Sequence, residues 1–313
     1  MTPGDPEQTA LGFADQAYRG TNAPWRVILA LILVIGGTIL LVQLVALIFT
    51  ALNLQDALVL LVSPARAGSA SLKASLLAFA FLMFSVAVML PLMQLILPWL
   101  HRRPWLSFIT AKPRFDWRLF ARSLGAMMGL ALLSLGFTVV TSPDALRWTA
   151  DWRKVALFAP LALAFLPLQA LAEEVLFRGY LAQLTGRVTR LRLIRLVLPA
   201  LLFTAAHSAN PEARYDFIWA SANYLLLAAY LGAISLLGDG LEASFGVHLA
   251  VNLNAALIVG SAVSVSPGPT LWLSGAPDFK GSVVETVMLL ALHYVLVFGV
   301  RRSPAVMKPA PKI

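Results

Sequence analysis

The stretch VILALILVIGGTILLVQLVALIFTALNLQ, from residue 27 to residue 55, contains no charged side chain. A bilayer core of about 30 Å is crossed by about 20 apolar residues in an α-helix. We therefore predict that this stretch spans a membrane as one helix. This prediction decides the class of fold.

The same pattern continues along most of the chain. Its 313 residues are 59% hydrophobic and 12% charged, with a mean hydropathy of +0.79, whereas soluble domains carry about 25% charged residues. The sequence therefore predicts an all-α fold, a polytopic integral membrane bundle of about eight transmembrane helices. The seven further apolar runs are residues 74–100, 123–143, 155–172, 196–206, 217–237, 243–263 and 283–300, and residues 53–64 are expected to form a short, partly buried helix.

The distribution of basic residues predicts the orientation in the membrane, because Lys and Arg accumulate in cytoplasmic loops. With eight spans both termini share one side, which carries 16 Lys and Arg residues against 7 on the other. Both termini are therefore expected in the cytoplasm. The composition, rich in Ala, Leu and Arg and free of Cys, indicates a bacterial plasma membrane.

The net charge of +9 and the pI of about 10.3 also arise from the Lys and Arg residues in the loops and tails. The basic residues lie between the apolar runs, where they meet lipid headgroups, so no nucleic-acid partner is expected. The absence of cysteine excludes disulfides, a thiolate nucleophile and Cys-ligated metals.

Ionisable residues inside apolar runs are the first candidates for chemistry, since a charge near the bilayer centre costs about 2.5–3.5 kcal/mol. Glu174 and Arg178 are four apart and share a helix face, which favours an ion pair. Glu173 points about 100° away and is expected to meet a different partner. The simpler alternative is a helix end with solvated charges.

Two further polar groups, His207 and the pair His248 and Asn252, lie in later apolar runs. Glu173 and His207 are each about 17 residues from an Arg-rich turn near Arg190, so a hairpin would bring them to one level. His248 and Asn252 are four apart and share a helix face. The simpler alternative for His207 is a histidine at the membrane surface. For His248 and Asn252 it is a structural polar contact between helices.

Glu285 and His293 are a further polar pair inside an apolar run. They are eight apart and therefore lie near one helix face. They are expected to make structural polar contacts and to be dispensable for catalysis.

Three short motifs follow one another on separate apolar segments: Glu-Glu-x-x-x-Arg at 173–178, Phe-x-x-x-His at 203–207 and His-x-x-x-Asn at 248–252. Together they resemble the CAAX-processing and bacteriocin-processing (CPBP) family of intramembrane glutamic endopeptidases, whose best-known members are the type II CAAX prenyl endopeptidases. The extension Gly-Tyr-Leu at 179–181 also matches. The resemblance covers residues 160–260.

The resemblance implies a hydrolase that cleaves a peptide bond of a membrane-associated or lipidated protein or peptide. Glu173 would act as the general base and His207 would orient the attacking water. His248 and Asn252 would stabilise the oxyanion. The expected supporting residues are Glu174, Arg178 and Phe203.

Other function classes stay open on the sequence alone. No cofactor is expected, but zinc held by Glu173, His207 and His248 is an alternative, because carboxylate and imidazole are ordinary zinc ligands. A proton-relaying transporter and a catalytically silent binding or immunity protein of the same fold are others. The chain contains neither a His-Glu-x-x-His zinc motif nor a Gly-x-Ser-x-Gly nucleophile motif.

Four regions result from these assignments. They are a polar cytoplasmic tail (1–26), the N-terminal transmembrane helices (27–150), a CPBP-like catalytic core (151–264), and the last transmembrane helix with a basic tail (265–313).

Overall fold

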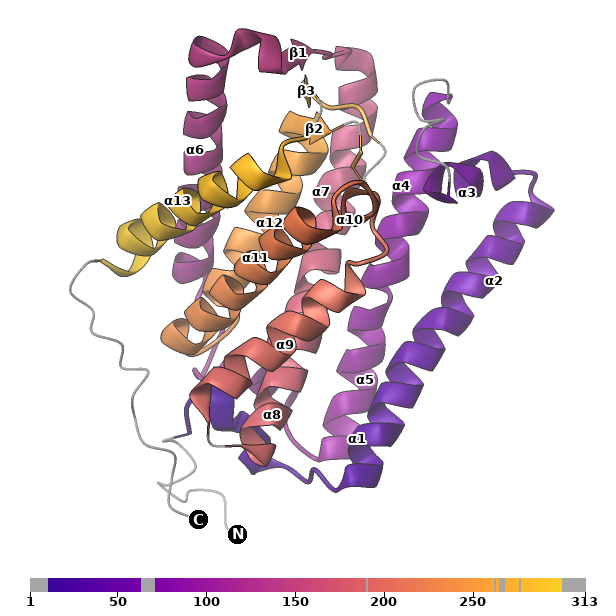
Figure 1. Ribbon diagram of the computed structural model, residues 1–313. Coiled ribbons are helices and arrows are strands. Elements are labelled where there is room, and N and C mark those ends of the chain that lie inside the picture. Colours follow the sequence, from indigo (N-terminus) through magenta and orange to yellow (C-terminus); the bar gives the residue numbers. More distant parts are fainter. Residues whose placement is uncertain are drawn as a thin grey trace.

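The computed structural model describes residues 11–62, 71–189, 191–261, 263–264, 268–275 and 277–299. They form a helical bundle with a small three-stranded sheet at one end (Figure 1). The predicted helical membrane bundle is confirmed. Within the described residues, six helices are long and apolar enough to cross a membrane, and Leu193–Ala206 is a shorter apolar helix. The expected count of eight therefore stays a prediction.

The first span begins and ends at residues with special backbone preferences. It consists of α1 (Pro24–Leu31), the π-helical turn η3 (Ile32–Gly36) and α2 (Gly37–Ala51). Pro24 occupies the first helical turn, where its missing N–H costs nothing. Asn53 has a left-handed φ of 55°, which ends the helix four residues earlier than predicted. The short helix expected after it is α3 (Gln55–Val62).

The second and third spans are set by side-chain caps. Ser71 caps α4 (Leu72–Ala87) by accepting a hydrogen bond from Ala74 N. After α5 (Met89–His101), the short 3-10 helix η5 (Trp105–Phe108) leads to α6 (Trp117–Thr141). Asp116 caps α6 by accepting a hydrogen bond from Leu119 N at 3.0 Å, which satisfies an otherwise free donor of the first turn.

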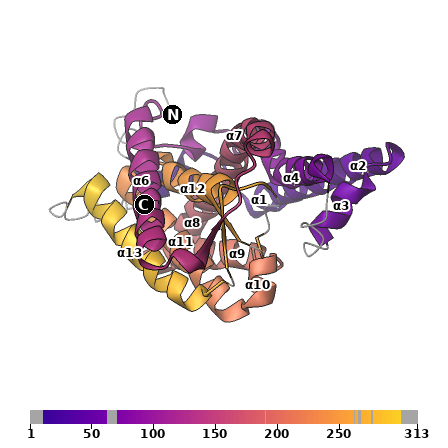
Figure 2. The same ribbon diagram turned by 90° about the horizontal axis from the view of Figure 1, so that it is seen from above.

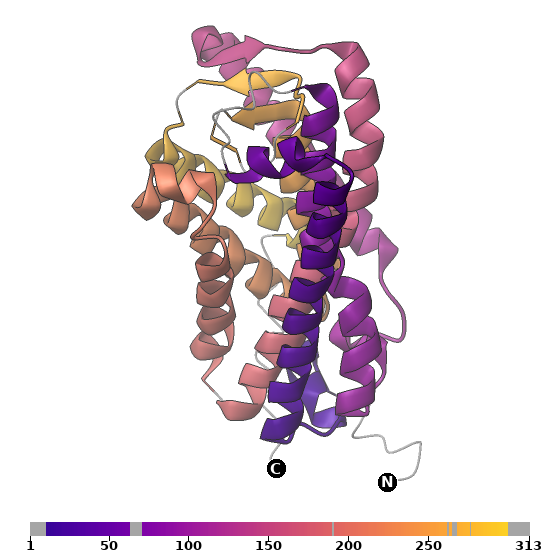
Figure 3. The same cartoon turned by 90° about the vertical axis from the view of Figure 1, so that its right-hand side faces the viewer.

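The predicted hairpin is present. Its first arm is α7 (Trp152–Glu174), the π-helical turn η7 (Val175–Leu181) and α8 (Ala182–Val188), and its second arm is α9 (Arg192–Ala206). The arms pack against each other along α8 and η7 (Figures 1 and 3). Arg190, the predicted tip, lies outside the described residues.

The remaining helices enclose α12 (Glu242–Leu253). After α10 (Pro211–Tyr215), α11 (Phe217–Gly238) leads into α12, which packs against α6, α7 and α11 (Figure 2). Every residue from Glu242 to Ala250 is buried. The π-helical turn η8 (Asn254–Ile258) extends α12, and α13 (Phe279–Phe298) forms the last described helix.

The seventh apolar run was predicted to remain helical to residue 263, and this extent is wrong. The chain leaves the helix after Ile258 and forms β2 (Val259–Ser261), which pairs in parallel with β3 (Trp272–Ser274). β1 (Leu146–Trp148) pairs with β3 on its other edge, antiparallel. Gly260 permits this pairing, because a Cβ there would lie 2.7 Å from Thr270 Oγ1.

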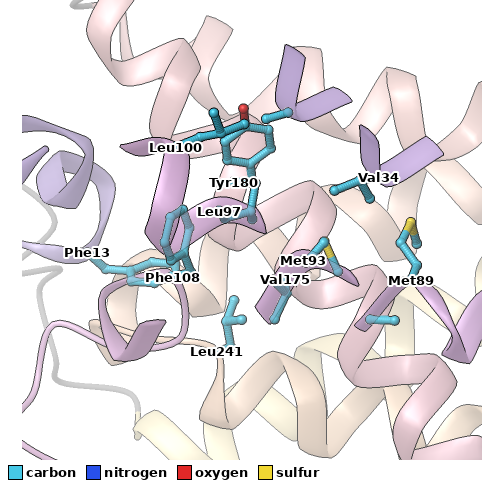
Figure 4. Packing of buried hydrophobic residues seen from close by; sticks show 12 residues of the cluster. Phe13, Val34, Met89, Met93, Leu97, Leu100, Phe108, Val175, Tyr180 and Leu241 are labelled. Carbon is cyan, nitrogen blue, oxygen red and sulfur yellow. The ribbon is translucent and has the colours of Figure 1, made fainter. Parts of the chain in front are cut away.

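The described part of the polar N-terminal segment packs against the bundle. The 3-10 helix η2 (Phe13–Arg19) contacts α8, and Phe13 joins a buried cluster beside Phe108 (Figure 4). Phe13 N donates a hydrogen bond to Asp239 Oδ1 at 2.8 Å, and Arg195 Nη1 lies 3.1 Å from Asp15 Oδ1. These contacts close the end of the bundle opposite the sheet.

The outer faces of several helices are apolar and exposed. On α6, Leu133, Phe137 and Val140 are 71%, 70% and 81% exposed. Apolar faces of this extent are unusual on soluble proteins, and lipid tails cover them in a membrane.

Candidate active site

The two adjacent glutamates lie where α7 passes into the π-helical turn η7. Both are buried, with Glu173 7% exposed and Glu174 fully covered. π-helical turns inside α-helices are rare and frequently occur at functional sites. This one follows the carboxylates directly and carries Arg178.

Glu174 is held from two sides. Its Oε1 accepts hydrogen bonds from Arg178 Nη1 at 3.0 Å and from His248 Nδ1 at 2.8 Å. The predicted ion pair with Arg178 is therefore confirmed. The bond to His248 was not predicted. An ionised carboxylate only accepts, so the hydrogen of this bond is on Nδ1, and Nε2 faces Glu173.

Arg178 connects the hairpin to its neighbours. Nη2 donates to the carbonyl of Ala228 in α11 at 3.1 Å, and the guanidinium lies 4.6 Å from the ring centre of Phe203 in α9. The next residue is Gly179, where a Cβ would collide with the carbonyl oxygen of Phe108. Arg178 thus forms the ion pair, and Gly179 beside it allows the backbone of Phe108 to approach η7 closely.

Glu173 has one bound and one free oxygen. Oε1 accepts a hydrogen bond from Gln169 Nε2 at 2.7 Å. Oε2 is buried without a hydrogen-bond partner among the described residues and lies 3.5 Å from His248 Nε2. A carboxylate held in place with a free acceptor oxygen has the geometry needed to take a proton from water.

Asn252 reaches this carboxylate through Gln169. Its Nδ2 donates to Gln169 Oε1 at 2.8 Å, while the other end of the same amide holds Glu173. An amide nitrogen carries two hydrogens, so one N–H of Asn252 remains available. His248 and Asn252, predicted to share a helix face, both converge on Glu173.

His207 follows the last residue of α9, and in the described part of the chain it makes no hydrogen bond to Glu173 or His248. Its Nδ1 lies 2.8 Å from the carbonyl oxygen of Phe203 and therefore carries the hydrogen. Its ring stacks on Phe203 at 4.2 Å, and Phe203 meets the ring of His248 at 6.0 Å. In the neutral tautomer the lone pair of His207 is on Nε2.

Two residues of the site were missed from the sequence. Gln169 lies one helical turn before Glu173, and its polarity inside an apolar run was the available signal. The ring of Tyr224 lies 4.9 Å from that of His207. No sequence spacing pointed to Tyr224, because it is on a separate helix.

The polar residues of α13 make contacts elsewhere. Glu285 accepts a hydrogen bond from the hydroxyl of Ser134 in α6. His293 Nδ1 lies 2.6 Å from the hydroxyl of Tyr230 in α11. Both are interhelical polar contacts, as expected.

The zinc alternative, with Glu173, His207 and His248 as ligands, stays a prediction. Among the described residues, no group of three or more His, Asp or Glu side chains is placed to hold a metal ion. Metal analysis of the purified protein tests this alternative.

Comparison with known proteins agrees with the motifs. Residues 155–254 match the model of a family described as type II CAAX prenyl endopeptidase Rce1-like. This segment is similar to the Rce1-like family. The Rce1-like segment runs from the first turn of α7 to the start of η8, and it contains every residue of the site described above. The resemblance found in the sequence is therefore confirmed over this segment.

The chain is also similar to a curated protein, the uncharacterized protein YyaK of Bacillus subtilis (strain 168). The two are 29% identical over 174 residues, which are 55% of this chain and 58% of YyaK. No solved structure matches the chain. The apolar helices and the Rce1-like segment together mark an integral membrane protein.

Proposed function

We propose that the chain is a membrane-embedded endopeptidase in which Glu173 activates the water that cleaves a peptide bond. One observation carries this proposal: a buried carboxylate with Oε1 fixed by Gln169 and Oε2 free, 3.5 Å from His248 Nε2. The match to the Rce1-like family supports the reaction class.

In the proposed first step, Glu173 removes a proton from water while the water oxygen bonds to the scissile carbonyl carbon. His207 accepts a hydrogen bond at Nε2 and orients that water. The carbonyl π electrons move to oxygen, and the resulting oxyanion receives hydrogen bonds from Asn252 Nδ2 and His248 Nε2. Donors of this kind are worth about 2.7–4 kcal/mol each.

The role of His248 has a protonation requirement. Its Nδ1–H is already donated to Glu174, so a hydrogen on Nε2 makes the ring an imidazolium. Glu174 and Glu173 together balance the charges of this imidazolium and of Arg178, since Glu173 Oε2 lies 3.5 Å from Nε2. The pairing thus gives Glu174 a positioning role.

In the second step the C–N bond breaks, and the proton taken by Glu173 passes to the leaving nitrogen. The products are a carboxylic acid, which ionises, and an amine. No metal or other cofactor enters this scheme. All electrons and protons are supplied by the water and the peptide bond.

The proposed substrate is a membrane-associated protein or peptide, such as a leader peptide or a transmembrane segment. We propose that the protein acts in a bacterial plasma membrane with both termini in the cytoplasm, which agrees with the excess of basic residues on that side. The peptide would enter from the cytoplasm or laterally from the bilayer.

The test compares peptides in membranes of cells that produce the wild-type protein or the Glu173→Gln variant at equal levels. An intact membrane peptide should accumulate in the variant, and its shorter products should appear only with the wild type. Asp144→Asn makes the same chemical change at an exposed position and should behave as wild type. Identical peptide sets for wild type and Glu173→Gln would contradict the proposal and favour a silent binding protein.

A further inference from the structure

A second polar region lies beside the proposed catalytic residues. Between α6, α11, α13 and the π-helical turn η8 there is a cavity of about 320 Å³. Ligand-binding pockets have volumes of about 300–1,000 Å³. Among the described residues that line the cavity, only Glu285 carries a charge. The apolar lining residues are Met127, Ala131, Leu227, Val251, Leu289 and Leu290.

Three residues on this wall, Asn223, Thr286 and Ser282, already use their hydrogen-bond donors. Asn223 Nδ2 donates to two backbone carbonyls, at 3.0 Å each. The hydroxyl of Thr286 donates to Asn223 Oδ1 at 3.0 Å, and that of Ser282 donates to a backbone carbonyl at 2.8 Å. These groups have no hydrogen left to offer a ligand.

Two oxygens on this wall can accept further hydrogen bonds. Asn254 Oδ1 is buried and receives no hydrogen bond from the described residues. Glu285 accepts one hydrogen bond, from Ser134, and no described residue binds its second oxygen. Glu285 is exposed on α13 at the edge of the cavity, and its negative charge attracts a cation. The matching ligand therefore has N–H donors and a positive charge at the end of an apolar stem, as in lysine and arginine.

The cavity and the catalytic residues share a side chain. Tyr224 lines the cavity, and its ring lies 4.9 Å from that of His207. A peptide whose scissile bond lies at Glu173 would place a neighbouring residue at the cavity.

We propose that this cavity is a specificity subsite that receives a lysine or arginine side chain of the substrate. The aliphatic stem packs against Leu227, Leu289 and Leu290, and the charged end binds Glu285 and Asn254 Oδ1. This assignment rests on the proposed function. It adds a substrate preference: a basic residue close to the cleaved bond.

The test measures binding without cleavage. The probes are two synthetic membrane-inserting peptides of leucine and alanine, identical except for a single central lysine or norleucine. The full-length protein carries Glu173→Gln and is embedded in phosphatidylcholine vesicles. The lysine peptide should bind at least about tenfold more tightly, since hydrogen bonds between charged groups are stronger than those between neutral groups. Adding Glu285→Gln should abolish this preference, whereas adding Asp144→Asn should preserve it.

Two further measurements use a variant that fills the cavity and a lipid that could compete with the peptide. Leu289→Trp should weaken binding of the lysine peptide by filling the cavity, even if Glu285→Gln lowers the yield of folded protein. Phosphatidylethanolamine, which also carries an ammonium group, should not compete. Equal affinities for the two peptides, a preference that survives Glu285→Gln, or competition by phosphatidylethanolamine would overturn the assignment. Cleavage by the Glu173→Gln protein would instead contradict the proposed function and leave the binding ratio intact.

Discussion

Glu173 and Glu174 are adjacent in the chain but have different partners. Glu174 is bound by Arg178 and His248, whereas Glu173 is held by Gln169 and keeps one oxygen free. The helical repeat predicted that the two side chains diverge, and the four-residue spacing predicted the ion pair. The spacing within a helix could not reveal Gln169 as a bridge to Asn252, because that contact joins residues 83 positions apart.

Gln169→Leu should therefore impair catalysis without unfolding the protein. The change removes the donor to Glu173 and the acceptor for Asn252, so kcat/KM should fall by about 10- to 100-fold. Gln43→Leu makes the same change at an exposed position of α2 and serves as the control. Cleavage rates of purified variants, with melting temperatures measured in parallel, check this. An unchanged rate for Gln169→Leu would remove Gln169 from the site.

The pairing of Glu174 with Arg178 predicts a non-additive pattern of stability. Arg178→Met leaves the buried carboxylate without its cation, and Glu174→Leu leaves the cation unpaired, at a cost of about 3–5 kcal/mol each. The double variant should melt at a higher temperature than either single variant, although it should be inactive because His248 loses its partner. Equal melting temperatures of all three proteins would contradict the ion-pair interpretation.

At the scale of elements, the apolar runs predicted where helices lie better than where they end. Asn53 ends α2 through a left-handed backbone, and Val259 starts a strand where a helix was predicted. Both ends depend on the local backbone or on pairing with distant residues, which an apolar run does not record. The π-helical turn η7 could not be predicted either, because the spacing of its polar and apolar residues is that of an ordinary α-helix.

Gly179→Ala tests whether η7 depends on close helix packing. The added Cβ would meet the carbonyl oxygen of Phe108, so the protein should lose about 1–3 kcal/mol of stability. Gly129→Ala in α6 adds the same methyl group at a position where no atom of the described residues lies within 4 Å. It should be neutral or stabilising by up to about 1 kcal/mol. Thermal melting of both variants in detergent checks this, and equal melting temperatures would show that η7 tolerates the added group.

At the scale of the whole molecule, the sequence predicted a membrane bundle and a helical hairpin whose two arms carry Glu173 and His207. Both are present. The sequence did not predict how the helices pack against one another. α12 lies between α6, α7 and α11, and this packing brings His248 against the two glutamates. Such contacts join residues on separate helices, and one sequence contains no direct record of them.

The orientation in the membrane is open to a direct test, because the chain has no cysteine of its own. Val188 ends α8 at one end of the bundle, and Ser142 follows α6 at the sheet end (Figure 1). Val188→Cys should react with a membrane-impermeant thiol reagent only in opened cells. Ser142→Cys should react in intact cells. The reverse pattern would place the termini outside.

The most direct measurement of the central claim is the cleavage rate of the Glu173→Gln protein. Purified wild type and variant are placed in liposomes with the membrane peptide that accumulates in Glu173→Gln cells. The amide preserves the shape of the side chain but cannot accept the proton of water, so the rate should fall by about 10²- to 10⁴-fold while the melting temperature changes little. A variant that keeps more than about a tenth of the wild-type rate would contradict the assignment of Glu173 as the general base.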